Sequence, residues 1–154
     1  MKLSKYFSLE EFTRSDTARK LGLDNTPTPE HIKNLSDMCI NLLDPIREAW
    51  GSPIVITSGY RGYKLNNAVG GSATSAHCFG LAGDTYPANG EIAKYKAFVP
   101  QFLKQSGCKY DQWINEKNKK GDEWGHIGYK DRKGRQRGQN LITTDGKKYS
   151  ALTV

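Results

Sequence analysis

The amphipathic stretch over residues 29–50 constrains the fold more than any other feature of this sequence. Its apolar side chains recur every third or fourth position, at Ile32, Leu35, Cys39, Leu42, Ile46 and Trp50. This is the period of a helix with one buried face. Thr28 and Pro29 predict where the helix begins, Gly51 predicts where it ends, and Pro45 predicts a kink. The apolar stripe is expected to pack into the core rather than to bind a ligand.

The rest of the chain favours a short opening helix and then strands arranged around one further helix. Ser8 and Glu11 form a capping-box pattern, which predicts a helix start. Residues 58–76 are rich in Gly, Ser, Asn and Ala and predict a long loop of the kind that usually serves function. Strands are expected at 53–57, 81–86, 111–116, 124–129 and 140–144, with a helix at 91–106. We therefore expect an α+β fold with a small, mostly antiparallel sheet, forming one domain over residues 1–154.

Positive charge is concentrated in the last quarter of the chain. The formal net charge is +7, and residues 115–154 contain ten basic and five acidic side chains, so most of the excess lies there. Such a patch suits a polyanion, although charge alone favours a solvated lysine-rich hairpin. No nucleic-acid-binding motif accompanies it, so we expect no nucleic-acid partner. The sequence contains no run of 18 apolar residues, so it predicts no membrane-spanning helix. The N-terminal residues lack the apolar segment of a signal peptide.

Two of the three histidines lie in segments that suit a hydrolytic zinc site. Such a site takes three ligands from His, Asp or Glu and leaves a fourth position for water, whose pKa zinc lowers to about 7. His77, Asp84 and His126 would supply the ligands. Glu123 would accept the proton of the water, and Arg61 would meet the developing oxyanion. Each fragment alone is a weak signal, and their joint occurrence in this order carries the hypothesis.

The role proposed for Glu123 requires a local departure from regular strand geometry. Glu123 lies three residues before His126, and an odd offset places two side chains on opposite faces of a strand. Glu123 must therefore leave the regular strand, with Gly121 and Gly125 as the flexible points. Glu116, at the end of the preceding strand, is a second carboxylate that competes for the role of base, and the spacing from His126 favours Glu123.

These residues form a set of motifs that resembles the LAS-type zinc peptidases. The motifs are Ile56-Thr57-Ser58-Gly59-Tyr60-Arg61, Ser75-x-His77-x-x-Gly80-x-Ala82-x-Asp84 and Glu123-x-x-His126, with softer matches at residues 6–12, 66–72, 111–114 and 137–139. The sequence is most similar to the branch that contains D-Ala-D-Ala carboxypeptidases and phage L-alanyl-D-glutamate endopeptidases. Gly83 and Gly125 depart from the pattern, since larger residues are expected there, and both are expected to loosen packing beside a ligand.

The resemblance implies a hedgehog/D-Ala-D-Ala peptidase-like fold and one Zn²⁺ ion on His77, Asp84 and His126. It implies Glu123 as general base, Arg61 as the group that polarises the scissile carbonyl, and Ser75 as a hydrogen-bonding residue for ligand or substrate. The substrate would be the peptide stem of bacterial peptidoglycan, cut by a monomeric, endolysin-type endopeptidase of a phage or prophage.

Two alternatives to this function stay open, and the resemblance also implies a place of action. One alternative is a D-Ala-D-Ala carboxypeptidase or dipeptidase, and the other is a non-catalytic, zinc-containing wall-binding or virion module. We expect the protein to be made in the host cytoplasm and to act on the wall after release. The basic C-terminal region would bind the anionic wall.

Overall fold

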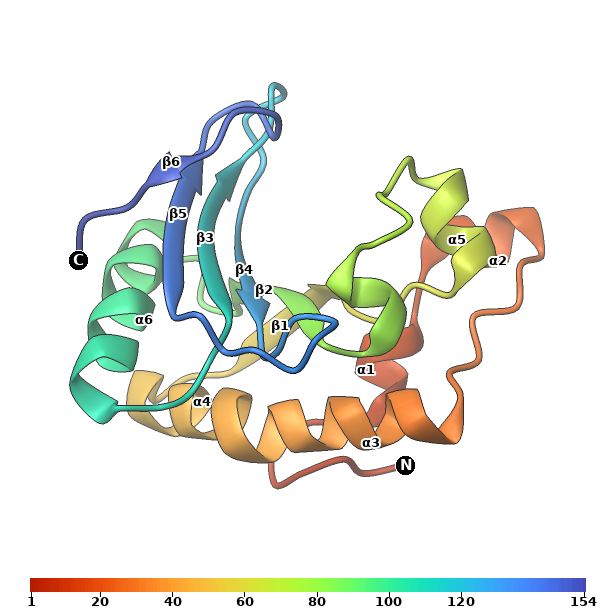
Figure 1. Ribbon diagram of the computed structural model, residues 1–154, viewed down its shortest axis with the longest axis horizontal. Coiled ribbons are helices and arrows are strands. Elements are labelled where there is room, and N and C mark those ends of the chain that lie inside the picture. Colours follow the sequence, from red (N-terminus) through yellow and green to blue (C-terminus); the bar gives the residue numbers. More distant parts are fainter.

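A six-stranded sheet organises the computed structural model, which describes residues 1–154 (Figure 1). The strands lie in the order β1-β2-β4-β3-β5-β6, and every neighbouring pair is antiparallel except β3 and β5, which are parallel. Their bounds are β1 Ile54–Ser58, β2 Ala82–Pro87, β3 Gln112–Lys117, β4 Glu123–Gly128, β5 Gln139–Thr143 and β6 Ser150–Ala151. This confirms the predicted α+β class with a mostly antiparallel sheet.

The helices begin and end largely where their caps predict. They are α1 Leu9–Thr13, α2 Asp16–Leu21, α3 Pro29–Met38, α4 Asp44–Trp50, α5 Tyr63–Ala68 and α6 Ile92–Ser106. The backbone N–H of Ser8 donates to the Glu11 carboxylate at 2.7 Å, as the predicted capping box requires. The Thr28 hydroxyl accepts from the backbone N–H of His31 at 3.1 Å, and Gly51 ends α4 with φ of 82°.

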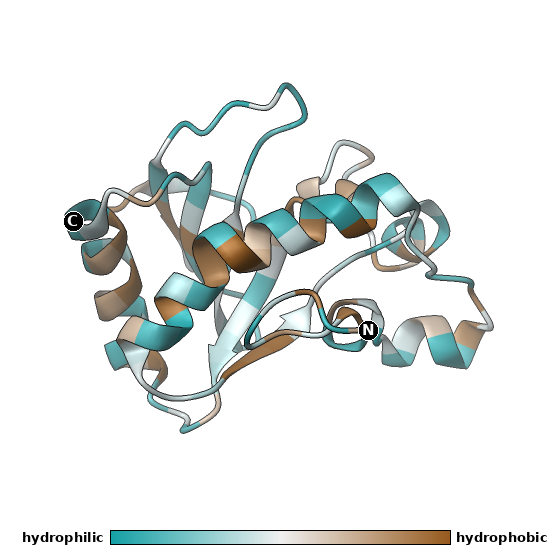
Figure 2. Cartoon of the chain, turned by 90° about the horizontal axis from the view of Figure 1, so that it is seen from below, coloured by the Kyte–Doolittle hydropathy of each residue, from teal (hydrophilic) through white to brown (hydrophobic).

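A π-helical turn, η1 (Cys39–Leu43), joins α3 to α4 where Pro45 predicted a kink. Pro45 has no N–H to donate, and its ring crowds the preceding turn of an α-helix. The wider turn accommodates the ring, and the backbone N–H of Asp44 bonds to the carbonyl of Cys39. The two helices therefore run on as one long rod, along which apolar and polar residues alternate in Figure 2.

The main core lies between this rod, α6 and one face of the sheet. Leu42 and Ile46 from the rod, Val99 from α6, and Trp113 and Ile127 from the central strands are all at most 1% exposed. Successive side chains of a strand point to opposite faces, so Trp113 and Ile127 face the core, while Ile114 and His126 lie on the other face, which is free to carry a site.

The segment that follows β1 is more structured than the predicted long loop. It contains α5 and a short 3-10 helix, η2 (Ala76–Phe79), and it lies opposite the free face of the sheet (Figure 1). The sequence missed both elements because each has fewer than two turns, too few for a hydrophobic period to show. None of the helices combines the length and the apolar character that crossing a membrane would require.

Candidate metal centre

Asp84 and His126 are placed side by side by the pairing of β2 with β4. They are register partners in this antiparallel pair, so their side chains project from the same face of the sheet. Nδ1 of His126 lies 3.0 Å from Oδ1 of Asp84. Both side chains are mostly buried, with 13% and 14% of their surface exposed.

His77 reaches the same point from η2, outside the sheet. Its Nδ1–H donates to the backbone carbonyl of Gly59 at 2.7 Å, which fixes the orientation of the ring. Nε2 then faces the cluster and lies 3.4 Å from Oδ1 of Asp84. Gly59 has no room for a side chain, because a Cβ would lie 2.6 Å from the backbone of Phe12. The contact between Gly59 and α1 therefore supports the carbonyl that orients His77.

The donor set of this cluster fits a zinc ion. His77, Asp84 and His126 each offer one ligand atom, and these atoms all lie within 4.8 Å of one another. Two imidazole nitrogens and one carboxylate oxygen are a typical catalytic zinc set that leaves one position open. The Gly59 carbonyl gives His77 the outer hydrogen bond that metal-ligating histidines usually make.

The electrostatics of the cluster favour an ionised carboxylate. Burial of Asp84 opposes its ionisation, but the charges and hydrogen bonds of His77 and His126 outweigh that cost and hold the pKa of Asp84 below its usual range. Asp84 is therefore an anionic ligand over the whole neutral range of pH.

Arg61 and Ser75 lie at the rim of the cluster. Nη2 of Arg61 donates to the hydroxyl of Ser75 at 3.3 Å, and the backbone N–H of Arg61 bonds to the carbonyl of His77. Nε of Arg61 is buried without a hydrogen-bond partner. A guanidinium held in this way keeps donors free for a ligand in the cleft. The structure thus brings both sequence-predicted residues to the cluster.

Glu123 lies away from the cluster, whereas Glu116 lines the cavity that contains it. Glu123 stays in the regular ladder opposite Lys117, so the odd offset from His126 puts it on the covered face of the sheet. There its carboxylate pairs with Nζ of Lys96 at 3.0 Å. This corrects the predicted position of Glu123, because the strand does not bend at Gly121 or Gly125.

Glu116 projects from the same face of the sheet as His126, whereas Glu123 projects from the opposite face. The register partner of Glu116 is Trp124, and its β3 neighbour on the same face, Ile114, is the partner of His126. Glu116 is 9% exposed and lines the cavity that contains the metal cluster. Burial raises the pKa of its carboxyl group, with the charge of Asp84 acting in the same direction and that of His126 opposing. The sequence signal for Glu116 was its place at the end of the strand before His126, but the face it takes relative to His126 depends on the register of β3 with β4.

The two glycines that depart from the family pattern behave differently from each other. A Cβ on Gly125 would lie 2.2 Å from the Trp113 indole, so Trp113 fills the space where a side chain is missing. A Cβ on Gly83 would meet only Phe12, at an ordinary 3.5 Å. The expectation of loose packing is therefore wrong for Gly125, where the covered face beneath His126 is tightly filled.

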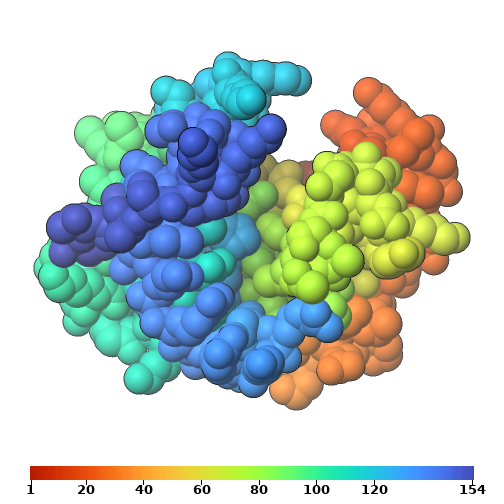
Figure 3. Space-filling model, turned by 45° about the horizontal axis from the view of Figure 1, so that its top comes forward, coloured from red at the N-terminus to blue at the C-terminus, as the bar shows by residue number.

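A cleft of about 1080 Å³ opens above the cluster. One wall is formed by residues 72–77 and Arg61, the floor by β2, β3, β4 and β5, and the other wall by residues 131–137. In Figure 3 a hollow separates the blue C-terminal strands from the yellow-green segment that follows β1. The indole N–H of Trp124 is buried at this cleft without a partner.

Comparison with known proteins agrees with this geometry. The family described as Peptidase M15 matches residues 5–118, about three quarters of the chain. The matched range contains Arg61, Ser75, His77, Asp84 and Glu116, and His126 follows it. No curated protein matches the sequence. Since M15 peptidases depend on zinc and the His-Asp-His cluster fits one ion, the chain belongs to the Peptidase M15 family and is a zinc metallopeptidase.

Proposed function

We propose that this protein hydrolyses a peptide bond in the stem peptide of bacterial peptidoglycan, as an endopeptidase of the endolysin type. The observation that carries the proposal is the position of Glu116 and Arg61 in one open cleft with the His-Asp-His cluster. Binding of a metal needs neither of these two residues, so their presence supports catalysis over a wall-binding or virion structural module.

His77, Asp84 and His126 would hold the zinc ion. When bound, zinc lowers the pKa of a coordinated water and polarises the scissile carbonyl. Glu116 is the general base in this proposal: its carboxylate accepts the proton of the attacking water and then donates it to the leaving amine. The raised pKa of Glu116 suits both steps, because the group must gain and lose a proton near neutral pH.

Arg61 stabilises the negative charge that develops on the carbonyl oxygen. Its guanidinium is held by the hydroxyl of Ser75, so little reorganisation is needed during the reaction. Ser75 also accepts the backbone N–H of His77, at 3.3 Å. Ser75 is therefore a positioning residue for both Arg61 and His77 in this proposal.

The shape of the cleft supports an endopeptidase over a D,D-carboxypeptidase or dipeptidase. An endopeptidase needs a groove that lets the substrate continue on both sides of the cut, whereas a carboxypeptidase needs a closed pocket around a free C-terminus. The cleft is bounded by two separate walls and has a large volume for one dipeptide.

The test is digestion of purified peptidoglycan with zinc-loaded protein, followed by mass analysis of the muropeptides. Endopeptidase activity releases fragments cut inside the stem, whereas carboxypeptidase activity removes only the terminal residue. Absence of any product with fully zinc-loaded protein would support the non-catalytic alternative.

We further propose that the basic C-terminal region binds the anionic cell wall, which the protein reaches after release from the cell that makes it. Lys117, Lys119 and Lys120 are exposed near the β3–β4 turn, away from the cleft. Neutralising all three should reduce cosedimentation with wall fragments at low salt, where exposed charges are least screened. Unchanged cosedimentation would count against this role.

A further inference from the structure

The connection between β4 and β5 forms one wall of the cleft and is unusually rich in cations. Four of its side chains, Arg132, Lys133, Arg135 and Arg137, line the same cavity as the metal cluster. Because β5 pairs with β3 and not with β4, this connection must pass the start of β3, and it does so on the cleft side.

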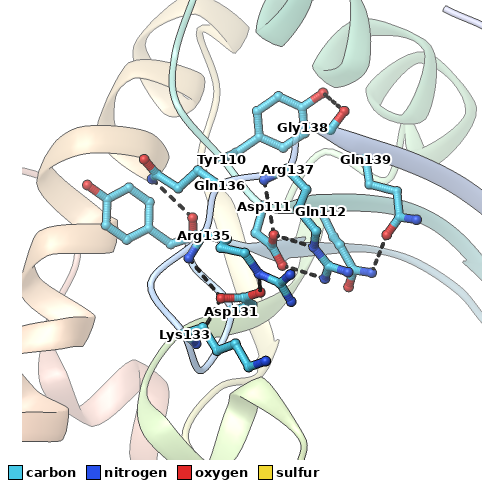
Figure 4. Close-up of polar contacts among 11 residues, drawn as sticks. Tyr110, Asp111, Gln112, Asp131, Lys133, Arg135, Gln136, Arg137, Gly138 and Gln139 are labelled. Atoms are coloured by element: carbon cyan, nitrogen blue, oxygen red, sulfur yellow. Dashed lines mark hydrogen bonds and ion pairs between the residues drawn. The ribbon is translucent and has the colours of Figure 1, made fainter.

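Internal hydrogen bonds hold this loop in one shape (Figure 4). Oδ1 of Asp131 accepts the backbone N–H groups of Lys133 and Arg135, at 2.9 and 2.8 Å, and Oδ2 accepts Nε of Arg135 at 2.6 Å. At the other end, Arg137 donates from Nε and Nη2 to the two oxygens of Asp111, at 2.8 and 2.9 Å. Asp111 is 4% exposed, so this pair anchors the loop to β3.

The acidic side chains of this wall are already paired with arginines, so its other cationic side chains have no acidic partner. Asp131 and Asp111 are each occupied by one arginine. Arg132 has only the face of the Phe79 ring, with its Cζ 5.1 Å from the ring centroid. Lys133 makes no side-chain hydrogen bond or ion pair, and both side chains belong to exposed residues. The wall therefore presents two unneutralised cations on a fixed frame.

Resting on the proposed function, we infer that Arg132 and Lys133 form a subsite that binds a carboxylate of the substrate peptide. In the proposed function the scissile bond lies beside the metal cluster and Glu116, and the 131–137 loop lines the same cavity, so it borders a peptide bound there. A fixed pair of cations favours an anionic group on that part of the peptide, with little entropy lost on binding. Two carboxylates have this chemistry: the C-terminal α-carboxylate and the internal carboxylate of the D-glutamyl residue.

Steady-state cleavage of three synthetic stem pentapeptides tests the subsite. The first peptide has both carboxylates free, the second has a C-terminal carboxamide, and the third has the D-glutamyl carboxylate amidated. The variant is R132A/K133A, which leaves the backbone donors to Asp131 intact. The matched control is K20A/K109A, which removes two exposed lysines outside the cleft.

We expect R132A/K133A to raise KM for the fully acidic peptide about tenfold with kcat unchanged, and K20A/K109A to leave KM unchanged. Amidation of the recognised carboxylate should raise KM of the wild type equally and abolish the effect of the variant. Which amidated peptide does this identifies the carboxylate.

An equal change of KM on all three peptides, or no change on any, overturns the subsite while cleavage by the wild type still supports the proposed function. If the wild type cleaves none of the peptides, binding of the same peptides to the zinc-loaded E116Q protein, measured by calorimetry, decides the subsite. Tenfold weaker binding of the acidic peptide on adding R132A/K133A supports it, and equal binding overturns it.

Discussion

The two faces of the β3–β4 hairpin carry similar side chains with opposite roles. On the covered face, Glu123 pairs with Nζ of Lys96, which also donates to the backbone carbonyl of Glu116 at 2.7 Å. On the cleft face, Glu116 has no cationic side chain in hydrogen-bonding contact and lines the cavity that contains the metal cluster. The two carboxylates of this hairpin thus lie on opposite faces by strand parity, and only Glu116 lies in the cleft where the proposed substrate would bind.

The comparison teaches that the covered face supports the cleft face. Lys96 donates to the backbone of the strand that carries Glu116, from the covered face. The Lys96 side chain is only 10% exposed, and Glu123 compensates its charge there. The carboxylate that the spacing from His126 singled out is therefore placed to stabilise the strand that carries the other one.

The largest expected effect separates the two carboxylates by activity. Glu116→Gln should lower kcat by about three orders of magnitude, because it removes the proton acceptor and donor, while zinc content stays at one ion per chain. Glu123→Gln is the matched control and should retain kcat within about tenfold. A loss of activity confined to Glu123→Gln would reverse the assignment.

Removal of the anionic ligand should abolish zinc binding. Asp84→Asn keeps the size of the side chain but removes the negative charge between His77 and His126. After gel filtration, elemental analysis should find about one zinc ion in the wild-type protein and almost none in the variant. Full retention of zinc by Asp84→Asn would show that the ligand set lies elsewhere.

A clash on the covered face should cost stability. Gly125→Ala forces a methyl group into the ring of Trp113, and such overpacking typically costs about 1–3 kcal/mol in the free energy of unfolding. Urea unfolding of the metal-free protein measures this cost. Gly83→Ala is the control, because its added methyl meets only an ordinary contact with Phe12. Equal costs for the two variants would contradict the packing described here.

The smallest expected effect concerns the stability of the metal-free protein, where Glu116→Gln and Glu123→Gln should change the free energy of unfolding in opposite directions. The pKa of Glu116 is raised on folding, so ionisation of this group destabilises the fold as the pH rises through that pKa. Glu116→Gln removes this destabilisation. The variant should therefore have a higher free energy of unfolding than the wild type at pH 7, and the difference between them should be smaller at pH 4. Glu123→Gln should instead decrease it at pH 7, by roughly 1 kcal/mol, because Lys96 loses its ionised partner. Shifts of the same sign at pH 7 would argue against distinct environments.

The sequence predicted most of the fold because its signals were local. Thr28, Gly51 and the stripe from Ile32 to Trp50 define one long helical rod by capping and period alone. The π turn before Pro45 was not predictable, because a kink and a widened turn both relieve the same clash. The short helix α2 shows too few apolar residues to reveal a period.

The candidate site was predictable in part. His77, Asp84 and His126 meet as expected, because the pairing of β2 with β4 puts Asp84 opposite His126 and η2 brings His77 to the same point. Glu123 was misplaced because its spacing from His126 was given more weight than the parity of the strand. The tight packing at Gly125 depends on Trp113 from another strand, which no local pattern encodes.

The parallel pairing of β5 with β3 has a consequence for how such an enzyme could be re-engineered. The crossing segment 131–137 contributes no metal donor, no base and no oxyanion donor. Its length and charge could thus be exchanged by grafting without displacing a reacting group. Substrate preference would then depend on one segment of the chain and catalytic activity on others.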